Sequence, residues 1–282
     1  MRALITGGGG QLASDLQALL GDRATSFARA ELDIADSAAV DRAFADVQPD
    51  VVFNCGAFHN LDVCEREPDR AWEVNVRAVR DLASRGAKLV HLSTNYVFDG
   101  RAPEAYGEDD LPSPRSIYAL TKLAGEHAAL AYGKGALVAR VAGLYGKHGS
   151  VSKGGNFVER MRARAVEQGF LKMVADQTLQ PTFTVDLAAA LVDAVERDVS
   201  GTVHLTAEGS CSWHEFTVAI LELAGIDAPV EAVTTTVAPG QPDRPLNGVL
   251  ARPRADALGL PRLRPWREQL ADYMAQTAPV AS

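Results

Sequence analysis

The sequence predicts an α/β fold in which a doubly wound parallel sheet is joined to a smaller C-terminal lobe. Through residues 1–145, short apolar runs alternate with longer amphipathic segments, and this rhythm favours a parallel sheet with helices on both faces. A run of glycines at 7–10 follows the first apolar run directly. Beyond residue 145 the alternation loosens into a polar, glycine-rich loop at 147–156, which indicates a second, smaller unit.

The expected elements follow one another in a regular order. The predicted strands of the first half span 2–6, 24–28, 51–54, 88–94 and 136–141, and the predicted helices span 10–20, 37–47, 68–85 and 116–132. Ser37 is the expected N-cap of its helix, while Gly21 and Gly86 stand where helices should end. The second half is expected to hold strands at 171–174 and 202–205 and a helix at 185–197.

The glycine run lies where a dinucleotide would bind. Gly7 and Gly10, followed by Ala13, stand between the first predicted strand and the first predicted helix. Glycines there permit a tight turn and a close approach to a pyrophosphate, and the helix N-terminus offers free N–H donors. A flexible glycine turn is the alternative, but the strand–loop–helix context is the one that a Rossmann-type dinucleotide site requires. We therefore predict a Rossmann-type fold that binds NADH or NADPH.

Residues after the second predicted strand bear on the choice of cofactor. Asp33 and Ile34 could hold the edge and the face of an adenine, although a surface Asp leading a helix is the alternative. The end of the strand, at 27–29, lacks the acidic residue that usually binds a free ribose 2′-hydroxyl. Arg29 stands there and could meet a 2′-phosphate, with Glu31 close by. The pattern favours NADPH over NADH.

The length of 282 residues allows a nucleotide domain with a smaller lobe. Residues 1–145 are expected to form the NAD(P)-binding Rossmann domain, with returns to its sheet around 184–206. Segments 146–183 and 207–282 are expected to form the substrate-binding lobe.

Composition and charge narrow the class of protein. A hydrophobic fraction of 47% and a charged fraction of 23% are ordinary for a soluble enzyme. The 28 basic and 36 acidic residues give a net charge of −8, so we expect no nucleic-acid partner. The sequence has neither an apolar run of membrane-spanning length nor a signal-peptide core, so we expect no membrane partner and a cytoplasmic location. Three cysteines without a C-x-x-C pair fit reduced thiols, and the scattered histidines indicate no metal site.

Tyr118 and Lys122 form the strongest chemical signal. They are four residues apart in a predicted helix, so both side chains can point into one cleft. Reduction of a ketone by hydride leaves an alkoxide that needs a proton, which the Tyr118 phenol can donate. A fixed ammonium beside the phenol is expected to lower its pKa and to stabilise the phenolate that remains.

A hydroxyl at the end of the fourth predicted strand completes a candidate catalytic set. Thr94 stands where ligands bind in open α/β sheets. Ser93 is the adjacent alternative, but side chains alternate along a strand, so only one of the two should face the cleft. A Tyr/Lys pair by itself is most often a surface pair. In this chain order, the glycine loop, the strand-end hydroxyl and the pair together favour a nicotinamide-dependent reductase.

These and other motifs resemble those of the extended short-chain dehydrogenase/reductase family and, within it, the dTDP-4-dehydrorhamnose reductases. The resembling segments are TGGGGQLA (6–13), LDIAD (32–36), VVFNCGAFHNLDVCE (51–65), STNYVFDG (93–100), IYALTKLAGE (117–126), GGNFVERM (154–161), ADQTLQPT (175–182), RPLNGVL (244–250) and LGLPRLRPWREQL (258–270). They span nearly the whole chain in family order. Y-x-x-x-K is shared widely, whereas STNYVFDG, GGNF and DQ-x-x-x-PT are far more specific to this branch.

The resemblance implies three sets of site residues. The catalytic set would be Thr94, Tyr118 and Lys122. The residues lining the cofactor would be Gly10, Gln11, Leu12, Asp33, Ile34, Gly56, Ala57 and Phe58. The residues facing a nucleotide-linked sugar would be Asn95, Tyr96, Asn156 and Phe157. Family members reduce dTDP-4-dehydro-6-deoxy-L-mannose to dTDP-L-rhamnose, and some dimerise around Mg²⁺, so the resemblance implies this reaction and allows a homodimer and Mg²⁺.

Three residues bear on the substrate in particular. Asn95 replaces the aspartate of the family's usual S-T-D-Y, and Gly143 stands where an aromatic side chain often contacts the sugar. Both departures leave hydride transfer intact and leave the exact sugar open. Arg244 is a candidate for the substrate diphosphate, because a bidentate guanidinium fits phosphate geometry.

Other functions share this fold. A sugar-nucleotide 4,6-dehydratase needs a carboxylate directly after the strand-four threonine, where this chain has Asn95. A 4-epimerase or another sugar-nucleotide reductase is compatible with the motifs, although an epimerase would keep NAD bound through turnover. A non-catalytic NADP-binding subunit, resembling the regulatory partner of methionine adenosyltransferase, also carries much of this motif set.

Overall fold

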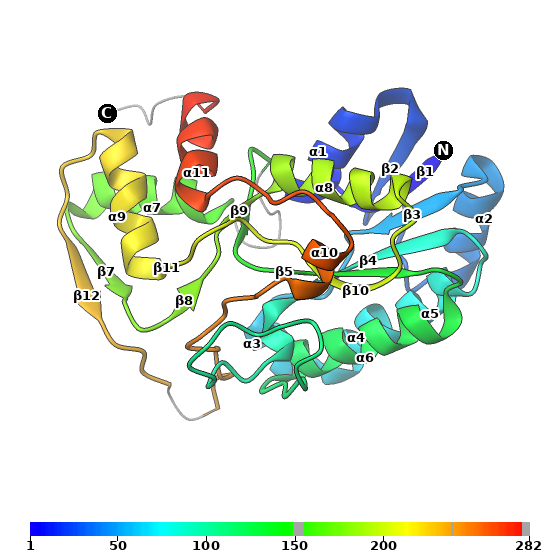
Figure 1. Cartoon of the computed structure of the whole chain (residues 1–282), viewed down its shortest axis with the longest axis horizontal. Coiled ribbons are helices and arrows are strands. Elements are labelled where there is room, and N and C mark those ends of the chain that lie inside the picture. Colours follow the sequence, from blue (N-terminus) through cyan, green and yellow to red (C-terminus); the bar gives the residue numbers. More distant parts are fainter. Residues whose placement is uncertain (149–154, 238–239, 278–282) are drawn as a thin grey trace.

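The computed structural model describes residues 1–148, 155–237 and 240–277. A six-stranded parallel sheet lies at the centre, in the strand order β10-β5-β4-β3-β1-β2 (Figure 1). The strands are β1 (Ala3–Gly8), β2 (Ala24–Ala28), β3 (Val51–Asn54), β4 (Lys88–Thr94), β5 (Leu137–Val141) and β10 (Gly201–His204). Strand order reverses beside β1, so the sheet is doubly wound and the predicted α/β fold class is confirmed.

Helices cover both faces of the sheet because successive strand residues point to opposite sides. In β1, Ile5 packs with Leu16 and Leu187 on the face covered by α1 (Gln11–Leu20) and α8 (Thr184–Glu196). Leu4 packs with Leu82 on the other face. That face carries α2 (Ser37–Val47), α4 (Pro68–Trp72), α5 (Ala78–Ala83) and α6 (Ile117–Tyr132), while the short α3 (Leu61–Arg66) packs on α6 (Figure 1).

Two local predictions for the helices are wrong in detail. Asp36, not Ser37, caps α2, because the Asp36 carboxylate accepts hydrogen bonds from the N–H groups of Ala38 and Ala39. The helix predicted at 68–85 is interrupted by a π-helical turn at Glu73–Arg77 and ends at Ala83. Turns of this kind occur often at functional sites.

A second cluster of elements lies at one end of the sheet (Figure 1). Its helices are α7 (Phe157–Gln168), α9 (Trp213–Ala224) and α11 (Trp266–Ala275). Its short paired strands are β6 (Leu144–Tyr145) with β9 (Thr182–Phe183), β7 (Leu171–Val174) with β12 (Val230–Val233), and β8 (Thr178–Leu179) with β11 (Cys211–Ser212). A separate aromatic core around Tyr145, Phe183 and Phe216 holds these elements together.

The tail does not belong entirely to this second cluster. Ala255 of α10 (Pro253–Ala257), together with Leu260 and Leu263, packs in the core of the sheet. This part of the segment 207–282 therefore departs from the predicted lobe, and the remaining domain boundaries stay predictions. Most of the predicted loop at 147–156 lies outside the described residues. Across the ranges that the structure describes, no helix is both long and apolar enough to span a membrane.

Candidate active site

A cavity of about 1300 Å³ opens at the carboxyl ends of the parallel strands, where ligands bind in open α/β sheets. It exceeds the roughly 1,000 Å³ upper range of small-molecule pockets, so it has room for two ligands side by side. Every site residue predicted from the sequence lines it. These are Gly7, Gly10, Gln11, Leu12, Arg29, Asp33, Ile34, Gly56, Ala57, Phe58, Thr94, Asn95, Tyr96, Tyr118, Lys122, Asn156, Phe157 and Arg244.

The glycine loop has the geometry that a pyrophosphate needs. Gly7 has φ of +74°, and a Cβ on it would stand 2.9 Å from the backbone nitrogen of Gly56. A side chain there would be strained and would push the two pocket-lining turns apart. Gly10 caps α1 without a side chain, so no capping group competes with an anion for the first N–H groups of the helix. These features fit a dinucleotide.

The far end of this cofactor cleft carries two arginines around one carboxylate. The guanidinium of Arg70 lies 2.6 Å from Asp33, and that of the largely exposed Arg29 lies 3.9 Å from it. Burial alone would raise the pKa of Asp33, but hydrogen bonds from Ala35 and Arg70 outweigh it, and the pKa is lowered. Glu31 turns away and accepts a hydrogen bond from the Ala28 N–H. Arg70 also pairs with Glu73 at 2.6 Å, so the guanidinium that remains available at this edge is that of Arg29.

The turn at Phe58 is held from behind by Asn75, which sequence reasoning missed. The Asn75 side chain accepts from the Phe58 N–H and donates to the Phe58 carbonyl oxygen, and it also donates to Thr121. Asn75 is buried in the π-helical turn. A single amide among the apolar residues of this helix was the available sequence signal.

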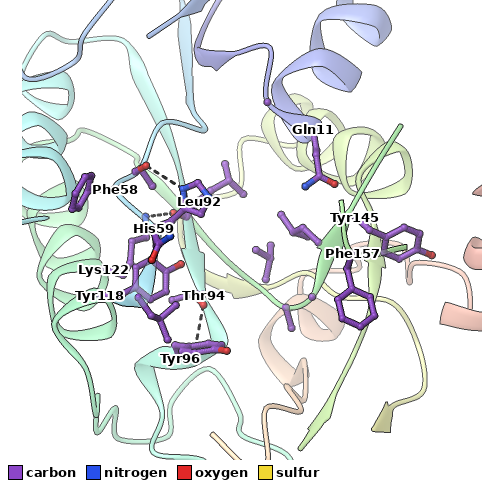
Figure 2. Close-up of a pocket in the computed structure, with 18 of the residues that line it drawn as sticks. Gln11, Phe58, His59, Leu92, Thr94, Tyr96, Tyr118, Lys122, Tyr145 and Phe157 are labelled. Atoms are coloured by element: carbon purple, nitrogen blue, oxygen red, sulfur yellow. Dashed lines mark hydrogen bonds between the residues drawn. The ribbon is translucent and has the colours of Figure 1, made fainter. Parts of the chain in front are cut away.

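The predicted catalytic side chains gather on one side of the cavity. Figure 2 shows Tyr118 and Lys122 projecting from α6 towards Thr94, with Gln11 reaching in from α1. Thr94 ends β4, and its hydroxyl lies beside the Tyr118 phenol in the wall of the cavity. Ser93 points the other way and donates to the buried Glu126 carboxylate, as strand alternation requires.

The electrostatics of the pair differ from the prediction. The pKa of Tyr118 is raised, chiefly by burial, and the hydrogen bond with Thr94 offsets only part of this. The Lys122 Nζ atom donates to the Leu92 carbonyl oxygen at 2.6 Å. Burial lowers the pKa of Lys122 to about 8. The phenol is thus protonated, which suits a proton donor.

The predicted substrate residues differ in how free their side chains are. Asn156 caps α7 and donates to the Gly146 carbonyl oxygen and the Tyr273 hydroxyl, so its amide is fully used within the chain. The Asn95 amide donates to the Gly248 carbonyl oxygen. Both line the cavity, and their predicted contact with a sugar stays a prediction.

The opposite wall comes from the second cluster of elements, and sequence reasoning found little of it. The Phe157 ring, shown across the cavity in Figure 2, packs 4.4 Å from that of Trp213, and both line the pocket. Thr235 lines it too, held by hydrogen bonds to Asp176 and Gln177. The motif ADQTLQPT at 175–182 was the sequence feature that indicated this wall. Only the fold shows that its Asp176 and Gln177 hold the segment at Thr235.

Arg244 brings a guanidinium to the side of the cavity where Tyr96 and Tyr118 lie. Arg244 lies beside the Tyr96 hydroxyl, and the Tyr96 ring meets the Tyr118 ring edge-on with the centroids 6.0 Å apart. Within the described ranges, no three His, Cys, Asp or Glu side chains group so as to hold a metal ion. The Mg²⁺ that the resemblance allows stays untested.

Comparisons with known proteins agree with this geometry. The family model "RmlD substrate binding domain" matches residues 1–278. The spore coat polysaccharide biosynthesis protein SpsK of Bacillus subtilis is 36% identical, with 98% of this chain and 97% of the relative covered. A dTDP-4-dehydrorhamnose reductase of Streptomyces griseus is 38% identical over 96% of this chain and 92% of its own. A crystal structure of dTDP-4-dehydrorhamnose reductase from Bacillus anthracis in complex with NADP superposes with a TM-score of 0.92 at 31% identity, over 98% of this chain and 99% of that one.

Proposed function

Because the chain belongs to the RmlD substrate binding domain family, we propose that it is an NADPH-dependent reductase of a nucleotide-linked 4-keto-6-deoxyhexose. The specific reaction proposed is dTDP-4-dehydrorhamnose to dTDP-L-rhamnose, as the name of the Streptomyces griseus relative indicates for that protein. The observation that carries the proposal is that Thr94, Tyr118 and Lys122 line one cavity with the glycine loop, with Tyr118 and Lys122 one helical turn apart on α6.

Each catalytic side chain has a defined task in this proposal. The cofactor, when bound along the glycine loop, supplies the hydride equivalent. Tyr118, whose raised pKa keeps the phenol protonated, donates its proton to the developing alkoxide oxygen. The Thr94 hydroxyl orients that oxygen, and the Lys122 ammonium stabilises the phenolate after transfer.

The exposed guanidinium of Arg29 at the adenosine end supports NADPH over NADH. Arg29 stands at the end of β2 with its guanidinium largely exposed, and Glu31 is occupied with the backbone. A 2′-phosphate placed there gains a charge-assisted hydrogen bond, whereas a free 2′-hydroxyl does not.

The other half of the cavity fits a nucleotide-linked sugar. Arg244 offers a bidentate donor to a diphosphate at the mouth, beside Tyr96. Phe157 and Trp213 offer an aromatic wall to a base. Asn95 places a neutral amide, and not a carboxylate, in the cavity wall next to Thr94, which suits a neutral deoxyhexose.

The test is oxidation of NADPH and of NADH with enzymatically made dTDP-4-dehydro-6-deoxyhexose, followed by loss of reduced-nicotinamide absorbance and by NMR of the sugar product. Turnover to dTDP-L-rhamnose supports the proposal. Turnover to a different C4 epimer would contradict the specific sugar. Tight cofactor binding without any turnover would contradict the reductase and favour a binding role.

A further inference from the structure

Lys122 and three buried polar side chains behind it form a continuous row of hydrogen-bonding groups. Lys122 Nζ lies 3.3 Å from His91 Nε2, and His91 Nδ1 lies 3.1 Å from the Asn54 amide. Asn54 Oδ1 accepts a hydrogen bond from the Thr6 hydroxyl at 2.7 Å, and Thr6 Oγ1 accepts one from the Gly56 N–H at 3.2 Å. The four side chains belong to residues that are at most 3% exposed. This row of hydrogen bonds thus runs from Lys122 to the turn at Gly56, which lines the cofactor cleft.

The number of protons that these hydrogen-bonded side chains can share limits their protonation states and tautomers. Burial first, and the charge on Lys122 second, hold the pKa of His91 well below its usual range, so the imidazole is neutral. A neutral imidazole has one N–H donor and one bare acceptor, whereas an ammonium has donors only. With Lys122 charged, His91 Nε2 must be the bare acceptor and Nδ1 must carry the proton. Asn54 must then turn its amide so that Oδ1 faces His91, which reverses the bond with Thr6, because Asn54 Nδ2 now donates to Thr6 Oγ1.

The other groups that face Lys122 cannot take this role. The thiol of Cys55 has a raised pKa because of burial and stays neutral. The carboxylate of Glu126 is bound to Arg140 at 2.8 Å and to Ser93. Tyr118, on the same helix, is a phenol whose pKa is raised by burial, so it stays protonated and neutral.

We infer that His91 is a positioning residue, whose bare Nε2 accepts a hydrogen bond from the Lys122 ammonium while Asn54 fixes its tautomer. The kinetic consequence of this inference rests on the proposed reductase function. Two acceptors, His91 Nε2 and the Leu92 carbonyl oxygen, then hold the ammonium in place. Because an accepted hydrogen bond favours the charged form, His91 keeps Lys122 protonated to higher pH than burial alone would allow.

The kinetic test compares His91→Phe with His91→Gln, in which the amide oxygen reaches the position of Nε2. Without the acceptor, Lys122 loses its proton at a lower pH. The alkaline limb of the kcat–pH profile of His91→Phe should therefore shift to lower pH by about one unit. The limb for His91→Gln should stay near that of the wild type. His204→Phe is the matched control, since it also removes a fully buried imidazole, outside the cavity, and should leave the limb in place. The inference is overturned if the alkaline limb does not move in His91→Phe, or if it moves by the same amount in His91→Phe, His91→Gln and His204→Phe.

A second measurement needs no turnover and so separates this inference from the proposed function. The chain has six lysines, so the ¹³Cε signal of Lys122 can be followed with pH in the NADPH-bound protein and assigned by its loss in Lys122→Gln. Long-range ¹⁵N–¹H spectra report the tautomer of His91. We expect an Nδ1-protonated His91 while Lys122 is charged, and a lower Lys122 titration midpoint in His91→Phe. An Nε2-protonated His91 beside a charged Lys122 overturns the inference even if His91→Phe fails to fold.

Discussion

The side-chain amide of Asn75 forms two hydrogen bonds with the backbone of Phe58, both 2.9 Å long. Asn75→Ala should therefore loosen the cofactor-lining turn and leave two backbone groups without partners. We expect the free energy of unfolding to fall by about 1–3 kcal/mol and the Kd for NADPH to rise. Thr217→Val removes a buried hydroxyl from α9 and should lower stability without changing that Kd. An unchanged Kd in Asn75→Ala, measured by fluorescence titration, would contradict this role.

Tyr118→Phe should abolish most of the reductase activity while cofactor still binds. The phenol is the proposed proton donor, and loss of a general acid lowers kcat by about 100-fold or more. Tyr132→Phe, on the exposed end of the same helix, is the control and should behave as the wild type. Near wild-type turnover by Tyr118→Phe would show that another group donates the proton.

Arg29→Ala should change the preference between the two cofactors. Loss of one charge-assisted hydrogen bond should raise the KM for NADPH roughly tenfold and leave the KM for NADH nearly unchanged. Arg23→Ala, a change outside the cavity, is the control. An equal effect on both cofactors would place the 2′-phosphate elsewhere.

Arg244→Lys should weaken substrate binding more than catalysis. A lysine cannot reproduce the bidentate contact with a diphosphate, so the substrate KM should rise about tenfold with kcat little changed. Arg115→Lys alters a cation that pairs with Asp243 outside the cavity, and it should leave both constants unchanged. If Arg244→Lys instead lowered kcat alone, Arg244 would act on the reacting sugar and not on the diphosphate.

His204 should make the protein less stable in acid. Burial lowers its pKa from 6.5 to about 4, so between these values the unfolded chain binds a proton that the folded protein does not. The stability is present above pH 6.5 and is lost as the pH falls towards 4, by up to about 1.4 kcal/mol per pH unit. Urea unfolding of the wild type and of His204→Gln at pH 7 and pH 5 measures this loss. The same loss between the two pH values in both proteins would assign the effect to other groups.

Several features of the site were predictable because they depend on residues close together in the sequence. The glycine loop follows a strand directly, and Tyr118 and Lys122 are one helical turn apart, so spacing alone places them. Strand alternation likewise separated Thr94 from Ser93. The α/β fold class and the family resemblance are confirmed for the same reason, since both rest on local motifs in a fixed order.

What the sequence by itself determined is therefore the sheet, the position of the glycine loop and the placing of the predicted catalytic residues around one cavity. Only the tertiary structure decided the pairing of Arg70 with Asp33, the support of Phe58 by Asn75, and the wall that Trp213 shares with Phe157. It also decided that burial raises the pKa of Tyr118, against the lowering expected from Lys122. The physical reason is that these contacts join segments far apart in the chain, and burial depends on everything that packs around a group, which no spacing along the sequence encodes.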